Sequence, residues 1–359
     1  MASSTESRQD TFSGTKEVAE SHRFDENRLR EYMEDHVEGF EGPLEVRQFK
    51  GGQSNPTYQL ITPGHKYVLR RKPPGKLLPS AHAVDREFRI ISALHSIDFP
   101  VARPYCLCED ESVVGTMFYI MDCVDGRIFW EPQIPAVDAD QRGAIYDAMN
   151  ETLARLHTVD YAALGLEDFG KPGNYFARQI GRWGKQYRAS ESESIEEMDR
   201  LLEWLPANIP PGDETTIVHG DYRLDNMVIH ATEPRVVAVL DWELCTLGHP
   251  LADFSYHLAP WWLPSFLFNG FADLDLTGTG IPSGDDYLAA YCRRTGRDGI
   301  DNLDFYFAYN VFRLAAILQG IAGRVRDGTA SSEHARQTAA AVQPLAQMSW
   351  EFAKRAGAS

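Results

Sequence analysis

Cysteine is scarce in this sequence, which contains five cysteines in 359 residues. They are scattered, and Cys106 and Cys108 have no second pair at the spacing of a zinc site. We therefore expect no disulfide framework and a reducing, cytoplasmic location.

Basic residues are also outnumbered, at 35 against 52 acidic ones, which gives a formal net charge of -17. This balance argues against nucleic acid or an anionic membrane as a partner, since both attract basic surfaces.

Long hydrophobic runs are missing as well. No run of about eighteen apolar residues occurs, so we expect no membrane span. The polar residues 1–23 predict a flexible leader and not a signal peptide. The full sequence is 43% hydrophobic and long enough for two lobes, which we place at residues 24–124 and 125–359.

Apolar periodicity separates these two lobes. Extended patterns and amphipathic helical patterns alternate in the first lobe, whereas helical patterns dominate the second. The first has helices over 24–38 and 81–96, strands over 44–49, 57–62 and 66–71, and a pair of apolar runs in 112–124. The second has helices over 140–157, 194–205 and 303–325. The predicted class is α+β: a small antiparallel sheet lobe with one helix, followed by a larger, mainly helical lobe.

The stretch "TIVHGDYRLDNMVIH" (216–230) resembles a hairpin with an unusually polar turn. A further hairpin, pairing 227–230 with 236–240, would bring Asn226 beside Asp241 at its open end. Two oxygen ligands with open positions suit Mg²⁺. A nearby carboxylate held off the metal, Asp221, can accept a proton from a hydroxyl. This combination fits phosphoryl transfer, in which positioning and charge neutralisation dominate.

"HGDYRLDN" followed by "LDWE" resembles the catalytic loop and metal-binding segment of the aminoglycoside phosphotransferase and choline kinase group, which has the protein kinase fold. The resemblance covers about residues 41–325. It implies ATP as donor, Asp221 as the residue that orients or deprotonates the acceptor hydroxyl, and Mg²⁺ held by Asn226 and Asp241. Glu243 has either a second-metal or an outer role.

The same resemblance implies structural roles for three further residues. His219 and Asp253 would brace the catalytic loop, although proton transfer by His219 stays a less favoured alternative. Trp242 would pack where protein kinases have a phenylalanine.

The first lobe would supply the nucleotide site. "FKGGQSNPTYQL" lies where the family has a phosphate-binding loop, with Gly52, Gln53, Ser54 and Asn55 as contacts. The family has lysine where Arg70 falls, and arginine differs in reach and hydration, so Lys72 is the alternative phosphate ligand. Glu87 would pair with Arg70, or be a solvated helix carboxylate. "FYIMDCVDG" resembles the hinge, where the Asp122 carbonyl and Val124 amide would meet adenine; the alternative is a plain edge strand.

Asp253 follows Asp241 by only twelve positions, which leaves little room for a polypeptide-binding platform and favours a small-molecule hydroxyl acceptor. "VLRRKPPGK" and "FRLAAILQGIAGR" are similar to the kinase-like domains fused to some acyl-CoA dehydrogenases, which implies hydroxylated acyl or related metabolites. Arg313, Arg324 and Arg326 would then meet an anionic acceptor, or Arg313 is a helix residue with its charged end in water. A nucleotide-binding pseudokinase and a true aminoglycoside-resistance kinase are the alternatives. The oligomeric state and the choice between ATP and GTP stay open.

Overall fold

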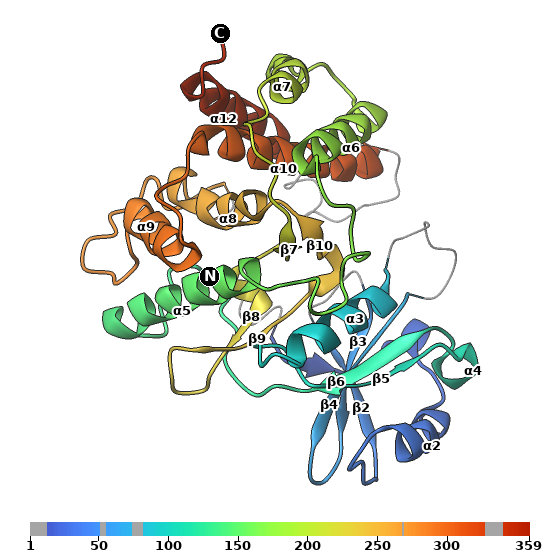
Figure 1. Cartoon of the computed structure of the whole chain (residues 1–359). Coiled ribbons are helices and arrows are strands. Elements are labelled where there is room, and N and C mark those ends of the chain that lie inside the picture. Colours follow the sequence, from blue (N-terminus) through green and yellow to red (C-terminus); the bar gives the residue numbers. More distant parts are fainter. Residues whose placement is uncertain (1–12, 51–54, 74–81, 268, 327–339) are drawn as a thin grey trace, which may run out of the picture. The chain divides into compact units, whose positions relative to one another are not determined.

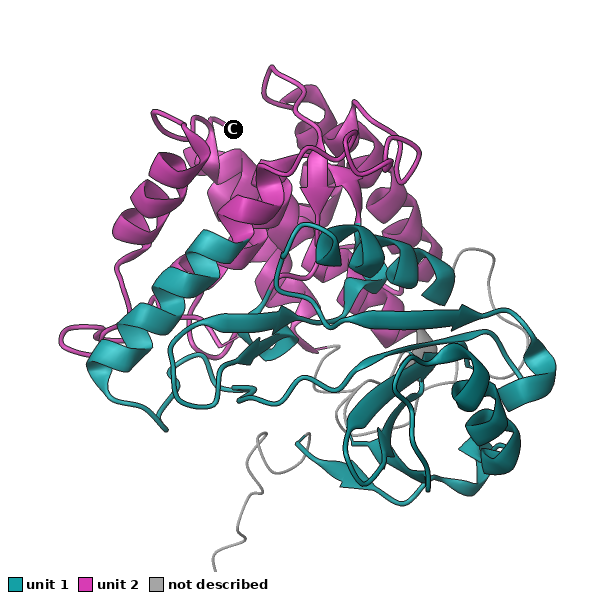
Figure 2. Ribbon diagram, turned by 60° about the horizontal axis from the view of Figure 1, so that its bottom comes forward, with its two compact units in different colours: residues 1–152, 223–245 teal, residues 153–222, 246–359 magenta. Residues whose placement is uncertain are grey.

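The computed structural model describes residues 13–50, 55–73, 82–267, 269–326 and 340–359. The expected phosphate contacts Gly52, Gln53 and Ser54 lie outside the described residues, as do the side chains of Arg324 and Arg326. The chain forms two compact units, coloured separately in Figure 2: unit 1 is 1–152 with 223–245, and unit 2 is 153–222 with 246–359. Unit 1 thus includes the whole expected sheet lobe and additional segments, while the lobe boundary at residue 124 stays a prediction.

A six-stranded sheet forms the centre of unit 1, with the strand order β1-β2-β3-β4-β6-β5 and every pair antiparallel. The strands are β1 (Thr15–Lys16), β2 (Glu45–Phe49), β3 (Thr57–Ile61), β4 (Lys66–Arg71), β5 (Pro104–Cys108) and β6 (Phe118–Asp122). The three strands predicted between residues 44 and 71 are confirmed. The sequence analysis missed β5, a short segment that begins at a proline and has no clear alternation.

Two longer helices accompany this sheet, α2 (Glu26–His36) and α3 (Val84–His95), both as predicted. Leu29 and Met33 of α2 join a buried cluster with Leu69 of β4. Successive side chains of a strand point to opposite faces, so Arg70 points away from this cluster, toward α3. A third helix, the one-turn α4 (Glu111–Val114), was not predicted. Its N-terminus is capped by the Asp110 carboxylate, which accepts the Ser112 N–H.

The polar stretch 216–230 is not one hairpin. β7 (Thr216–Val218) pairs with β10 (Thr246–Gly248), and β8 (Met227–Ile229) pairs with β9 (Val236–Val239). The expectation that its two apolar runs form one hairpin is therefore wrong. Eight residues separate β7 from β8, more than the two to five of a common hairpin loop. The predicted pairing of β8 with β9 is confirmed, with Met227 opposite Val239.

Short 3₁₀ segments complete the description of unit 1. They are η1 (Glu20–His22), η2 (Leu224–Asn226) and η3 (Trp242–Leu244). η2 immediately precedes β8, and η3 follows β9 after Asp241. The two ends of the β8–β9 hairpin therefore carry the residues Asn226 and Asp241, which the sequence analysis placed side by side.

Unit 2 is mainly helical. It contains the end of α5 (Ala139–His157), then α6 (Tyr175–Ser190), α7 (Glu196–Ala207), α8 (Pro250–Leu258), η4 (Ala259–Trp262), α9 (Gly284–Thr295), α10 (Leu303–Arg326) and α12 (Val342–Arg355). The predictions of α5, α7 and α10 are confirmed, and α6 was missed because glycines interrupt its pattern. One of them, Gly184, lies close to α7: a Cβ there would lie 2.6 Å from Leu202 Cδ2, so the leucine side chain would have to shift.

Helix α10 forms the core of unit 2 and packs against α12, α6 and α8 (Figure 1). Its segment Leu303–Gly323 is long and apolar enough, by length and composition alone, to cross a membrane. However, 78% of that segment is buried inside the unit. Packing within the unit therefore accounts for its apolar side chains.

Candidate active site

Four charged side chains meet inside unit 1, and we call them the Arg70 cluster: Arg70, Glu87, Asp241 and Glu243. Arg70 is 8% exposed, and its Nε lies 2.9 Å from Glu87 Oε2. Its Nη2 lies 2.6 Å from Asp241 Oδ1 and 3.4 Å from Glu243 Oε2. A single guanidinium therefore joins the carboxylate of α3 to the two carboxylates that follow β9.

Glu87 is the most deeply buried member of this cluster, at 1% exposed. Tyr119 donates its hydroxyl to Oε2 at 3.1 Å, and Asn55 donates its amide to Oε1 at 2.9 Å. Burial raises the pKa of Glu87 to about 7, although the charge of Arg70 pulls in the opposite direction. The predicted pairing of Glu87 with Arg70 is confirmed, and the alternative of a solvated helix carboxylate is wrong.

Neighbouring carboxylates stabilise the positive charge of Arg70. Burial alone would lower its pKa, but the carboxylates of Glu87, Asp241 and Glu243 outweigh burial and leave that pKa raised. Lys72, the alternative phosphate ligand, lies instead near Asp85, with Nζ 3.6 Å from Oδ1 and both side chains partly exposed. Of the two candidate phosphate ligands, Arg70 is therefore the buried one.

Asn55 was expected in the phosphate-binding loop, and its side chain is fully buried. Besides its bond to Glu87, its Oδ1 lies 2.8 Å from the His82 ring nitrogen Nδ1. These two bonds connect the end of the expected phosphate loop to α3. A contact between Asn55 and a nucleotide stays a prediction.

Asp241 adopts an unusual backbone conformation. Its φ is 62°, in the left-handed region that few non-glycine residues occupy and that often marks functional sites. The neighbouring Trp242 is buried, donates its indole N–H to the Val239 carbonyl at 2.9 Å and contacts the Phe99 ring edge-on. The predicted packing role of Trp242 is confirmed, and this anchored ring holds the chain directly after Asp241.

Asn226 lies at the start of the same hairpin. Its backbone carbonyl accepts the N–H of Leu240 at 2.8 Å, so Asn226 is bonded to the residue directly before Asp241. The strand pairing predicted that Asn226 and Asp241 lie close together, and the backbone hydrogen bond confirms that their main chains do. The amide of Asn226 and the carboxylate of Asp241 are both oxygen donors of the kind that Mg²⁺ binds. Among the described residues, no group of three or more His, Cys, Asp or Glu side chains is arranged to hold a metal.

The expected hinge residues Asp122 and Val124 lie at the end of β6 and two residues beyond it. The Asp122 carboxylate accepts the Tyr105 hydroxyl at 2.7 Å and contacts His65 Nε2 at 2.8 Å. These contacts involve the Asp122 side chain and not its backbone carbonyl, which is the group expected to meet adenine. The contact of either backbone group with adenine stays a prediction.

The chain just after the hinge is bonded to the β8–β9 hairpin. Arg127 and Ile229 exchange two backbone hydrogen bonds, of 2.7 and 2.8 Å. This close approach requires Gly126, because a Cβ there would lie 2.5 Å from the carbonyl oxygen of Ile229. The expected hinge and the hairpin that carries Asn226 and Asp241 are therefore fixed to one another within unit 1.

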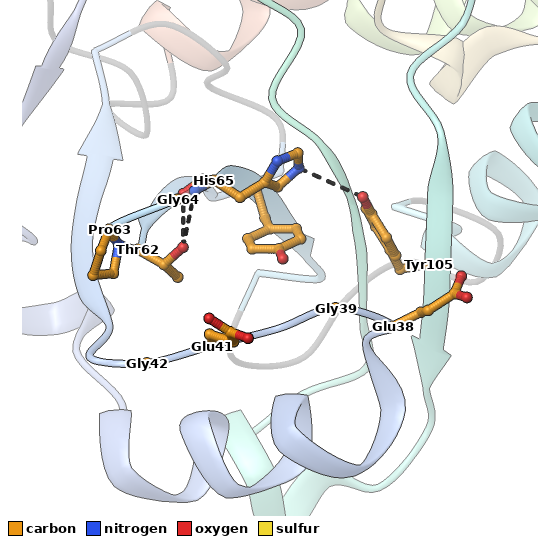
Figure 3. A pocket seen from close by; sticks show the side chains of 10 residues that line it. Glu38, Gly39, Glu41, Gly42, Thr62, Pro63, Gly64, His65 and Tyr105 are labelled. Atoms are coloured by element: carbon orange, nitrogen blue, oxygen red, sulfur yellow. Dashed lines mark hydrogen bonds between the residues drawn. The ribbon is translucent and has the colours of Figure 1, made fainter.

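A hollow of about 400 Å³ opens near the turn between β3 and β4 (Figure 3). Its walls include the rings of His65, Tyr67 and Tyr105 and the carboxylates of Glu38 and Glu41. None of the residues predicted for the site lines this hollow. We therefore do not assign it to the chemistry of the site.

In unit 2, the loop after β7 is held by Asp253 of α8. Its carboxylate accepts the backbone N–H of His219 at 2.7 Å and of Gly220 at 2.9 Å, and its Oδ2 lies 3.3 Å from His157 Nε2. Burial would raise the pKa of Asp253, which is 3% exposed, but His157, His219 and the backbone bonds hold it below its usual range. The predicted role of Asp253 as a brace is confirmed.

Asp221 follows this braced backbone. Its N–H donates to His219 Nδ1 at 3.2 Å, and its Oδ1 accepts the Tyr256 hydroxyl at 2.6 Å. Because His219 Nδ1 accepts a backbone N–H, that nitrogen carries no proton in this arrangement. His219 is fully buried, and its geometry supports the bracing role over proton transfer.

Two residues near Asp221 have contacts that the sequence analysis did not predict, Tyr256 and Arg313. The Arg313 guanidinium donates to the Gly220 carbonyl at 2.6 Å and lies 5.2 Å from the centre of the Tyr256 ring. Arg313 is 8% exposed, so the alternative of a charged end in water is wrong. Tyr256 had a usable signal, since it follows Asp253 by three residues and therefore shares its face of the helix.

Comparison with known proteins identifies the family of this chain. Residues 45–306 match the model described as the phosphotransferase enzyme family.

The chain belongs to the phosphotransferase enzyme family.

The relatives of this phosphotransferase family member include a mouse protein named acyl-CoA dehydrogenase family member 11. It is 46% identical over 354 residues, which are 96% of this chain and 45% of the mouse protein. The chain thus spans less than half the length of the curated relatives it matches.

Solved structures agree with the family assignment. A protein from Ralstonia eutropha jmp134, provisionally named an aminoglycoside phosphotransferase, is 54% identical with a TM-score of 0.86, over 93% of this chain and 99% of the other. Aminoglycoside phosphotransferase APH(4)-Ia, solved as a thermostable mutant with ADP and hygromycin B, has a TM-score of 0.60 at 13% identity over 92% and 98% of the two chains. The predicted α+β kinase-like fold, an antiparallel sheet with a helix followed by a mainly helical part, is thereby confirmed.

Proposed function

We propose that this chain is an ATP-dependent phosphotransferase that transfers the γ-phosphate to a hydroxyl group of a small metabolite of the hydroxyacyl class. The observation that carries this proposal is the Arg70 cluster. It joins a buried cation, a helix carboxylate and the carboxylate after the β8–β9 hairpin. Phosphoryl transfer depends mainly on fixed charges around the phosphates, and this cluster provides them.

Mg²⁺ is the metal that the donor set would suit. Asp241 already faces a cation, since Arg70 Nη2 lies 2.6 Å from its Oδ1, so its position accepts positive charge. Asn226 and Asp241 would hold the ion, and two protein ligands leave the remaining positions to water and phosphate oxygens. When bound, the metal would neutralise charge on the phosphates.

The residues of this chain then have separate tasks in the proposal. Arg70 contacts the phosphates from β4, and Glu87 keeps its guanidinium in place. The backbone of Asp122 and Val124 holds adenine. Asp221 accepts the proton of the acceptor hydroxyl, and it is presented by a loop whose two preceding N–H groups are held by Asp253.

The acceptor class rests on two supports. Only eleven residues connect Asp241 to Asp253, which favours a small acceptor over a polypeptide. The mouse relative carries an acyl-CoA dehydrogenase name and extends beyond the matched region, so a kinase acting on hydroxylated acyl compounds would suit the same protein chain.

The decisive experiment is an acceptor screen with Mg-ATP. Hydroxyacyl-CoA compounds with the hydroxyl at different carbons would be compared with sugars, amino alcohols and aminoglycosides, and phosphorylated product would be detected by mass spectrometry. We expect turnover with a hydroxyacyl compound. Turnover only with aminoglycosides would transfer the assignment to a drug kinase, and the absence of any product would contradict the proposal.

The role of Asp221 is tested with the acceptor that the screen finds. We expect Asp221→Asn to lower the rate by about 10²-fold or more, because the group that receives the proton is lost. Asp225→Asn is the matched control, since Asp225 is a neighbouring loop carboxylate that pairs with Arg223 at 3.1 Å. Equal rates for Asp221→Asn and the wild type would show that the role is misassigned.

A nucleotide-binding pseudokinase is the second candidate, and one observation favours it. Arg70 replaces the family lysine and already occupies Asp241 Oδ1. Such a protein would be stabilised by nucleotide in thermal-shift titration and would give no product with any acceptor. Product formation that depends on Asp221 excludes this candidate.

A further inference from the structure

Helix α8 holds the Asp221 loop at two points. Asp253 accepts the N–H groups of His219 and Gly220, and Tyr256, on the same helix face, donates its hydroxyl to Asp221 Oδ1 at 2.6 Å. One side chain thus fixes the backbone before Asp221, and the other fixes the carboxylate itself. The distance of 2.6 Å is typical of a hydroxyl that donates to a charged carboxylate, which is a stronger hydrogen bond than one between neutral groups.

Helix α10 reaches the same loop through Arg313. Its Nη2 donates to the Gly220 carbonyl at 2.6 Å, while the Gly220 N–H donates to Asp253 at 2.9 Å. Gly220 has a φ of 86°, a conformation that is strained for other residues. Both polar groups of this residue are therefore held, from two different helices, directly before Asp221.

Arg313 is a buried cation that needs compensation. Its guanidinium lies against the rings of Tyr256 and Trp183, at 5.2 and 5.9 Å from their centres. Burial alone would lower its pKa, but neighbouring tyrosines and the Asp221 carboxylate leave that pKa raised. An isolated buried charge costs several kcal/mol unless other groups compensate it. Here Tyr256 stands between the cation and a carboxylate, because its ring faces Arg313 and its hydroxyl binds Asp221.

We propose that Tyr256 and Arg313 are positioning residues for Asp221: the Tyr256 hydroxyl sets the orientation of the carboxylate toward the acceptor hydroxyl, and Arg313 fixes both the Tyr256 ring and the Gly220 peptide. This inference rests on the proposed function, since it concerns the same reaction. Besides the residues assigned under the proposed function, two residues on two helices thus act on Asp221. They belong to the acceptor side of the reaction and leave the binding of nucleotide to unit 1.

Tyr256→Phe is the first test, because it removes only the hydroxyl. With the acceptor identified by the screen, we expect kcat to fall about tenfold through misorientation of Asp221, while KM for ATP stays within about twofold. Tyr146→Phe is the matched control: Tyr146 is a buried tyrosine whose hydroxyl donates to the Pro132 carbonyl at 2.7 Å, within unit 1. A kcat for Tyr256→Phe equal to that of this control would overturn the proposal.

Arg313 is tested by comparing Arg313→Met with Arg313→Lys. Lysine keeps the charge and can donate to the Gly220 carbonyl, whereas methionine keeps only an unbranched apolar side chain. We expect kcat to fall in Arg313→Met and to recover in part in Arg313→Lys, again with KM for ATP little changed. A loss that affects KM for ATP as much as kcat would indicate general disruption and would contradict a positioning role.

A stability cycle tests the Tyr256–Asp221 contact without any turnover, and so separates this inference from the proposed function. The melting temperature is measured for the wild type, Tyr256→Phe, Asp221→Ala and the double variant. We expect Tyr256→Phe to change the melting temperature in the wild type and much less in the Asp221→Ala background. Additive changes would overturn the inference even if the kinase proposal holds, whereas a coupled result with an inactive wild type would support the contact and contradict only the kinase proposal.

Discussion

The Arg70 cluster of unit 1 and the Asp221 loop of unit 2 hold their charged groups in different ways. Arg70 binds Glu87, Asp241 and Glu243 through side-chain ion pairs. In unit 2, by contrast, Asp253 binds backbone N–H groups, and Arg313 binds a backbone carbonyl. A side-chain ion pair can change partners when a competing charge arrives, whereas a bond to the backbone keeps the loop in one position.

This difference suits the two halves of the proposed reaction. In the proposed reaction, Mg-nucleotide would bring both negative and positive charge to Arg70 and Asp241, so their mutual bond would have to be replaced when it binds. The group that receives the acceptor proton gains from staying still, because misplacement of a reacting group is costly. The predictions below test whether unit 2 depends on rigid bracing and unit 1 on exchangeable charges.

The largest effect is expected for Asp253→Ala. It leaves the buried N–H groups of His219 and Gly220 without an acceptor, and each unsatisfied donor costs about 1–3 kcal/mol. We therefore expect the free energy of unfolding, measured with urea, to fall by about 2–6 kcal/mol. Asp273→Ala is the control, because Asp273 also accepts the Ser265 N–H and hydroxyl, but at an exposed position. Equal losses of unfolding free energy for the two variants would show that the buried Asp253 carboxylate stabilises the protein no more than an exposed one.

Several contacts in these two regions could be predicted from the sequence. The resemblance of the first lobe to the family implied that Arg70 pairs with Glu87, and strand pairing placed Asn226 near Asp241. The pairing of β7 with β10 was missed, because it joins segments about thirty residues apart. Tyr256 could have been found from its i+3 spacing to Asp253, but the contacts of Arg313 depend on how α8 packs against α10, which no local pattern encodes.

The next prediction concerns the pH response of unit 2. Burial lowers the pKa of His257 to about 4, despite the Tyr222 carbonyl and Asp253, which raise it; His157 lowers it further. Because the folded protein binds this proton less readily than the unfolded chain, stability is lost as the pH falls from about 6.5 to about 4, by about 3 kcal/mol. Urea unfolding should show that His257→Gln loses less stability than the wild type over this range.

The difference in stability between the wild type and His257→Gln isolates the contribution of His257 to the pH response. The pKa of His249 is also lowered to about 4, mainly by burial, but His249 is present in both proteins, so its contribution cancels. His95→Gln, at an exposed position of α3, should keep the wild-type response. Parallel pH curves for the wild type and His257→Gln would contradict the prediction.

Unit 1 should respond to pH in the opposite direction through Glu87. Because burial raises the pKa of this carboxyl from 4.5 to about 7 in the folded protein, its contribution favours stability at low pH and is lost as the pH rises through that interval. The stability of the wild type relative to Glu87→Gln should therefore fall between about pH 4.5 and about pH 7. Glu34→Gln, on the exposed side of α2, should show no such trend. A relative stability that rises over this range would mean that Arg70, not burial, controls Glu87.

The smallest effect on stability, and the sharpest test of exchangeable charges, is expected for Arg70→Lys. An ammonium group can stay near Glu87 but lacks the planar fork that also reaches Asp241 at 2.6 Å. Losing that bond should lower the free energy of unfolding of the free protein by about 1 kcal/mol. It should also remove a competitor from Asp241, so the rise in melting temperature on adding Mg-ATP should be larger than in the wild type. A smaller rise would mean that Arg70 holds the phosphates more than it blocks the metal ligand, and that its contact with Asp241 does not oppose nucleotide binding.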